Sequence, residues 1–192
     1  MKILILLFAL SISAVAQTLT ATTTDGRKVS LKPDGTWAFV ESGEATVSIE
    51  AGLVYQSGDT KPLARVTFWL LNKEPGQILV DAGLKAFAET SIFADIPPLQ
   101  LLHTLGAAAS YPATEYRAFF DAAVRALQKH VIEITTTDFN GKAAFNPVSV
   151  GVCYLLGFTK TPKGFALWSI KLDLKPGQQK IILDQHNALF AR

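Results

Sequence analysis

Short stretches in which apolar and polar residues alternate recur along most of the chain after about residue 45. They are rich in valine, isoleucine, threonine and aromatic residues, which favour the pleated surface of a β-sheet. This pattern predicts strands at residues 45–55, 61–71, 131–137, 142–145, 150–159, 164–174 and 179–183. Turn-forming residues separate several of them, at 138–141, 161–164 and 175–177. The first of these turns is expected to fold residues 142–145 back on 131–137 as a hairpin. Short strands with a turn about every ten residues predict a mainly β fold, an antiparallel β-sandwich.

A separate small β unit is predicted ahead of the sandwich, in residues 17–43. This segment contains two Asp-Gly pairs, at 25–26 and 34–35, and glycine readily adopts the positive φ that a tight hairpin turn needs. We therefore expect two consecutive β-hairpins. Trp37 and Phe39 alternate onto one side of the last strand, so the unit should have an apolar face.

A helical pattern interrupts the strands between about residues 81 and 130. The spacing of apolar residues changes there from two to about 3.6, and alanine and leucine become frequent. The most regular helix is predicted at 114–131, where one apolar face includes Tyr116, Phe120, Val124 and Leu127. The charged residues Arg117, Asp121 and Arg125 lie on the other side, four positions apart, a spacing that favours ion pairs along the helix.

Two further helices are expected in the same region. One enters through Pro97 and Pro98 and ends near Gly106, and the other spans residues 82–93. The whole segment at about 81–130 is interpreted as an α-helical insertion between two strands of a sandwich domain that spans residues 44–192.

The N-terminus has the pattern of a cleavable secretion signal at residues 1–16. Lys2 is followed by an apolar run that ends with small residues at Ala14 and Ala16, so cleavage is expected before Gln17. The run of about 14 residues is shorter than the roughly 20 needed to span a bilayer. We therefore expect an exported protein, periplasmic or extracellular, with no membrane span.

The net charge bears on the expected partners, and the cysteine content bears on how the fold is stabilised. The chain has 18 basic and 16 acidic residues, and removal of Lys2 leaves a net charge of +1. A charge so close to zero gives no electrostatic reason to expect nucleic acid as a partner. The single cysteine, Cys153, cannot form an internal disulfide, and its apolar neighbours predict a buried small hydrophobic residue.

Several motifs, taken in order, resemble those of the carboxypeptidase regulatory-like domain. They are Pro-Leu-Ala-Arg-Val at 62–66, Thr-Asp-Phe-Asn-Gly-Lys-Ala-Ala-Phe at 137–145, Val-Gly at 150–151 with Tyr154, and Leu-Lys-Pro-Gly at 174–177. The family belongs to the prealbumin-like β-sandwiches, which include collagen-adhesin B-type repeats. The resemblance implies a prealbumin-like sandwich over roughly 46–183, excluding the middle. The helical insertion, Cys153 and Val150 depart from the family pattern.

Candidate chemistry is sparse. Asp138, Asn140 and Gly141 could begin a calcium loop, but residues 142–150 supply no acidic ligand, so a plain turn is expected. The three histidines, His103, His130 and His186, lack the short paired spacing of a zinc site. Burial in the core, rather than an aromatic binding platform, is expected for Trp37, Trp69 and Trp168. We expect no enzymatic activity, no metal and no cofactor.

The interpretation is therefore a non-catalytic exported binding or structural module of the bacterial cell envelope, with a protein or glycan as partner. The face formed by Tyr116, Phe120, Val124 and Leu127 is the candidate partner-binding surface if it does not pack onto a sheet. If it does pack, the loops are the better candidates.

Two alternatives stay open. A carrier of a small apolar ligand would have a closed cavity between helices and sheet, lined by Phe87, Ile92, Leu102 and Phe119. A hydrolase with a scattered active site would bring a histidine, a carboxylate and a serine or metal together in a cleft.

Overall fold

The computed structural model of the 192-residue chain describes the following residues: 20–23, 28–31, 34–39, 43–54, 59–85, 96–110 and 114–191. The chain divides into two compact units, residues 1–42 and 43–192. The predicted signal at 1–16 and the first Asp-Gly pair at 25–26 lie outside the described residues.

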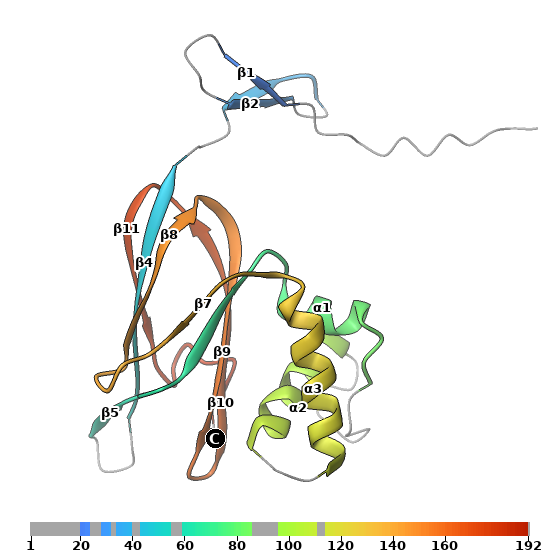
Figure 1. Cartoon of the computed structure of the whole chain (residues 1–192), viewed down its shortest axis with the longest axis vertical. Helices are drawn as coiled ribbons and strands as arrows, with labels where there is room; N and C mark the ends of the chain where they lie inside the picture. The colour runs from blue at the N-terminus through green and yellow to red at the C-terminus, as the bar shows by residue number, and fades with distance from the viewer. Residues whose placement is uncertain are drawn as a thin grey trace, which may run out of the picture. The chain divides into compact units, whose positions relative to one another are not determined.

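The first unit is a three-stranded antiparallel sheet of β1 (Thr20–Thr22), β2 (Lys28–Leu31) and β3 (Trp37–Phe39), as the hairpin pattern predicts (Figure 1). Gly35 takes a φ of 82°, and the carboxylate of Asp34 accepts a hydrogen bond from the Thr36 amide at 2.9 Å. Trp37 lies opposite Leu31 and is 55% exposed. The expectation that Trp37 is buried is wrong, because a sheet this small has no second layer of its own.

The second unit contains a β-sandwich whose first sheet is built around β4 (Glu44–Val54). This strand pairs with β11 (Gly177–Leu183) along one edge and with β8 (Lys142–Ser149) and β5 (Thr60–Pro62) along the other. The pairing with β11 is parallel, which departs from the antiparallel arrangement expected throughout. The other two pairings are antiparallel.

The second sheet is antiparallel throughout. Its five strands follow the order β12 (Phe190–Ala191), β10 (Gly164–Leu174), β9 (Gly151–Thr161), β6 (Thr67–Leu71) and β7 (Val131–Thr136). The long pair β9 and β10 occupies the middle of the unit (Figure 1).

A first hydrophobic core fills the space between the two sheets. Alternation along β4 turns Val47 and Ile49 inward, as its sequence predicts. The rings of Phe68 and Trp168 lie with their centroids 6.1 Å apart, and both side chains are fully buried. The indole N–H of Trp168 donates to the carbonyl oxygen of Asp184 at 2.9 Å, which satisfies the only polar atom of that side chain.

Three helices cover part of the outer face of the five-stranded sheet and create a second core. They are α1 (Pro75–Asp81), α2 (Pro97–Ser110) and α3 (Thr114–Gln128), drawn to the right of the strands in Figure 1. The second core joins leucines of both layers, each at most 1% exposed: Leu79, Leu105, Leu127, Leu156 and Leu167. The mainly β sandwich with an α-helical insertion is therefore confirmed, and the insertion forms a third layer. Within the described residues, no helix is long and apolar enough to cross a bilayer.

Two strand predictions need correction. The expected strand at 61–71 is two strands, β5 and β6, because Arg65 adopts a φ of 60° and turns the chain between them. The expected hairpin between residues 131–137 and 142–145 is also wrong. β7 pairs with β6 in one sheet and β8 pairs with β4 in the other, so the turn at 138–141 crosses between the sheets.

The helix boundaries also differ from those expected. The first helix begins at Pro75, where the Glu74 side chain accepts hydrogen bonds from the two amides of residues 76 and 77. Residues 82–85 are not helical, and residues 86–93 of the predicted helix lie outside the described residues. The second helix does not end near Gly106 but continues to Ser110, and Gly106 lies inside it against the ring of Phe165, where the missing side chain lets helix and sheet approach closely.

Gly106 provides a test of this third layer. A Cβ added at Gly106 would lie 2.2 Å from the Phe165 ring, so Gly106→Ala should overpack the second core and destabilise the protein by about 2 kcal/mol. Urea unfolding followed by circular dichroism measures the change.

The sign of the effect is the decisive feature, because alanine normally stabilises a helix interior by roughly 0.5–1 kcal/mol relative to glycine. Ala118→Gly, at an exposed position of α3, calibrates that propensity and should cost about 1 kcal/mol. A neutral or stabilising Gly106→Ala would contradict the close packing of α2 on β10.

Candidate binding site beside helix α3

The apolar face of α3 packs onto the five-stranded sheet. Leu127 is fully buried in the second core, and Tyr116 and Phe120 are partly buried against it. Val124 is half-buried. Partner binding by these four side chains stays a prediction. Because Leu127 is buried, a partner would contact the margin of this face.

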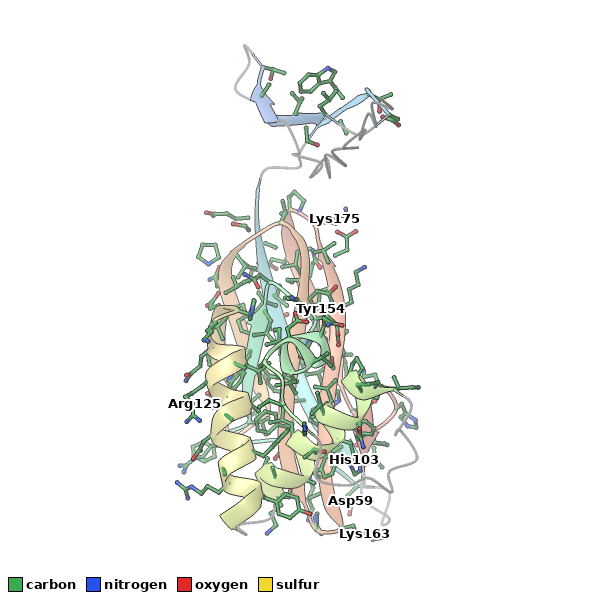
Figure 2. The ribbon with its side chains drawn as sticks, turned by 90° about the vertical axis from the view of Figure 1, so that its right-hand side faces the viewer. Asp59, His103, Arg125, Tyr154, Lys163 and Lys175 are labelled. Atoms are coloured by element: carbon green, nitrogen blue, oxygen red, sulfur yellow. The ribbon has the colours of Figure 1, made fainter. Side chains whose placement is uncertain are left out.

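An open hollow of about 490 Å³ lies at this margin. Its walls come from three elements: Ala108, Ala109 and Ser110 at the end of α2, Arg117, Phe120 and Asp121 on α3, and Lys160 on β9. The volume falls in the range of roughly 300–1,000 Å³ typical of small-molecule sites. In Figure 2, Lys163 marks the turn that follows β9, and Arg125 marks the side of α3 that faces solvent.

Phe120 forms the apolar part of the hollow, and neighbouring rings hold it in place. Its ring packs edge to face on Phe158, with centroids 5.8 Å apart at 88°. Phe158 in turn packs on Trp69 at 6.0 Å and 76°. Such edge-to-face contacts stabilise aromatic pairs, so Phe120 has a fixed orientation before any ligand binds.

The three charged side chains of the hollow have no partner inside the described part of the protein. The salt bridges found in the described part of the chain join Lys73 to Asp81, Glu50 to Lys142 and Lys180, and Asp173 to Lys175. Arg117, Asp121 and Lys160 take part in none of them, so the ion pairs that the spacing of α3 favours are not formed. Their charges are therefore available to a ligand.

A second exposed feature lies where two turns of the sandwich meet. The guanidinium carbon of Arg65 stands 5.2 Å from the centre of the Phe139 ring, and Phe139 is 73% exposed. Buried Thr137 ties the turns together: its hydroxyl accepts a hydrogen bond from the Val66 amide at 2.9 Å and donates to the Leu63 carbonyl at 2.5 Å. This pair is the best loop candidate for contact with a partner.

The segment 138–141 is a turn, as its sequence predicts. Asp138 accepts hydrogen bonds from the amides of Lys142 and Asn140, both at 2.8 Å, and these bonds lower the pKa of its carboxyl group. Gly141 has a φ of 73°, and a Cβ there would meet the Ala51 carbonyl oxygen at 2.3 Å.

The histidines lie on different elements. His103 packs edge to face on Phe165 and Phe190, and His130 shares a 3.0 Å hydrogen bond with Asn72. His186 lies in the loop after β11, beside Gln185. Across the described ranges, no group of three or more histidine, cysteine, aspartate or glutamate side chains is placed to hold a metal ion.

The two alternative functions, a carrier of a small apolar ligand and a hydrolase with a scattered active site, gain little support from this arrangement. Leu102 and Phe119 are 1% and 5% exposed and fill the second core, while Phe87 and Ile92 lie outside the described residues. The hollow beside α3 has no histidine in its wall.

Cys153 is buried, as predicted, and burial raises the pKa of its thiol to about 11, so it is a packing residue.

Comparison with known proteins does not assign the chain to a family. No family model and no curated protein matches it. Among solved structures, a candidate carbohydrate-binding protein of Pseudomonas aeruginosa is 15% identical, with a TM-score of 0.40, over 76% of this chain and 90% of that one. A minor pilin of Streptococcus agalactiae is 10% identical, with a TM-score of 0.34, over 84% of this chain and 60% of the pilin.

A pilus backbone protein of Streptococcus pneumoniae is 16% identical, with a TM-score of 0.28. That match covers 68% of this chain and 34% of the pilus protein, so the chain spans about a third of its length. The sequence identities and TM-scores of all three structures are too low for their roles to be assigned to this chain. Membership of the carboxypeptidase regulatory-like family stays a prediction.

The Asp138 turn predicts a defined response to acid. Because its pKa lies below the ordinary value of 3.8, the carboxylate stabilises the fold above about pH 4, and this contribution is lost as the pH falls through the folded-state pKa. A carboxyl-carbon NMR titration should give a pKa below 3.8 for Asp138, and Asp138→Ala should flatten the acid side of the stability profile. A measured pKa at or above 3.8 would contradict the hydrogen bonding of this turn.

The unpaired charges predict variants that leave stability unchanged. Arg117→Ala and Lys160→Ala should each alter the free energy of unfolding by less than about 0.5 kcal/mol, because neither side chain has a salt bridge to lose in the part of the chain that the structure describes. Phe120→Ala should cost about 2 kcal/mol, since it removes a half-buried ring from its contact with Phe158. Chemical denaturation measures all three, and a large loss in either charge variant would mean that the charge is paired.

Proposed function

We propose that this chain is a non-catalytic, exported binding module of the bacterial cell envelope that holds part of a protein or glycan in the hollow beside α3. The observation that carries the proposal is the set of three charges, Arg117, Asp121 and Lys160, which line the hollow together with Phe120 and have no salt bridge within the described residues. Charged side chains without such a partner are available for recognition.

The frame around the hollow supports this role. α3 is anchored through fully buried Leu127 and Ala123, and the Phe120 ring is held by Phe158. A site whose residues are already in place loses less conformational entropy when a ligand binds. The hollow therefore needs little rearrangement to accept one.

The chemistry of the hollow supports binding rather than catalysis. Among the described residues of its wall, the only hydroxyl is that of Ser110, which donates to the Gly106 carbonyl oxygen at 3.1 Å within α2. A serine nucleophile would instead need a general base within hydrogen-bonding reach. Export rests on the signal pattern at 1–16, which places the mature chain where envelope glycans and proteins are its neighbours.

The proposal is tested with the mature chain starting at Gln17, immobilised and exposed to a solubilised bacterial envelope fraction. Arg117→Ala combined with Lys160→Ala should lower the amount of captured ligand at least about tenfold, since each lost charged hydrogen bond is worth roughly 1.5–3 kcal/mol. Quantitative sugar analysis and proteomics of the eluate provide the readout.

Arg125→Ala is the matched control, because Arg125 is an exposed arginine of the same helix that does not line the hollow. It should leave capture within about twofold of the parent protein. If Phe139→Ser abolishes capture while the double variant does not, the partner docks at the Arg65 and Phe139 turns and the proposed site is wrong.

A further inference from the structure

The cationic side chains of the hollow select for a ligand with an anionic acceptor. Arginine and lysine offer only hydrogen-bond donors, and the planar fork of Arg117 matches the two oxygens of a carboxylate. Lys160 belongs to β9 and Arg117 to α3, so an anion within reach of both would meet donors from two elements. A neutral ligand would leave both charges without a matched partner.

Asp121 adds an opposite requirement. Its carboxylate can only accept hydrogen bonds, so the ligand must also present donors such as hydroxyl groups. A ligand that carries carboxylates alone would meet repulsion at Asp121, which stands four residues from Arg117 on the same helix. The site therefore fits a molecule that combines one carboxylate with several hydroxyls.

The apolar surface of the hollow completes the description. Phe120 offers an aromatic ring, and Ala108 and Ala109 offer small methyl groups that leave room beside it. The C–H face of a sugar ring is a flat apolar surface that can pack on such a ring, with its hydroxyls directed to the polar rim. The hollow is open, so a longer chain can leave it at the side.

We infer, building on the proposed function, that the hollow recognises an acidic sugar unit of a glycan, of the uronic acid type. Its carboxylate binds Arg117 and Lys160, its hydroxyls donate to Asp121, and its ring packs on Phe120. An acidic peptide also offers carboxylates to the two cations and backbone N–H donors to Asp121, but it lacks the flat C–H face of a sugar ring to pack on Phe120, so the acidic sugar is the better match.

The inference is tested by calorimetric titration of the mature protein with three probes: trigalacturonate, neutral maltotriose and triglutamate. Trigalacturonate should bind at least about tenfold more tightly than either of the others, because only it supplies both the anion and the hydroxyl donors. Arg117→Ala should weaken its binding about tenfold or more, and Arg125→Ala should leave it within about twofold.

Asp121→Ala separates recognition of a sugar from simple attraction of an anion. Removing a negative charge from the site would strengthen binding of any anion held by charge alone. For an acidic sugar the same change removes the acceptor for its hydroxyls, so binding of trigalacturonate should weaken about fivefold. Chemical-shift mapping on the unmodified protein should place the probe at Ala109, Asp121 and Lys160, independently of any variant.

Tighter binding of trigalacturonate by Asp121→Ala, equal or tighter binding of triglutamate, or shifts located elsewhere would overturn the inference. Absence of trigalacturonate binding, together with envelope capture that still depends on Arg117 and Lys160, would overturn the sugar class and leave the proposed binding function standing. Envelope capture that is insensitive to both cations would instead refute the proposed site.

Discussion

The central part of the five-stranded sheet is buried on both faces, and the rest of the second unit depends on this. Leu155 of β9 faces the other sheet and Leu156 faces the helices, and both are at most 1% exposed. A sheet covered on one side only would leave Leu156, Leu167 and their neighbours in water. The helical segment is thus a structural layer of the domain, and its removal would expose the sheet residues of the second core.

This packing also determines where a ligand can bind. The apolar side of α3 is used to cover the sheet, so the residues left at its margin are Arg117 and Asp121. Lys160 lies two positions after Phe158 on β9, and side chains two apart in a strand share a face, which brings a charge from the sheet to the same margin. Because neighbouring residues of α3 and β9 are buried in the second core, the backbone that carries these charged groups is held in place.

The sequence predicts local features well and distant contacts poorly. The alternation in β4, the turn at 138–141 and the helical period of α3 depend on neighbouring residues, and all are present. The pairing of β8 with β4 depends on residues about 100 positions apart, which no local pattern encodes. Gly106 looked like a helix end because its close contact with Phe165 is invisible in the sequence, and Lys160 joins Arg117 only after β9 and α3 have packed.

The central claim, that the helices form a core with the outer face of the five-stranded sheet, is tested most directly by proton NMR. The account predicts strong nuclear Overhauser effects between the α protons of Gly106 and the ring protons of Phe165, and between the rings of Phe120 and Phe158. Absence of both, with amides of α2 and α3 exchanging with solvent as fast as those of an unfolded chain, would contradict it.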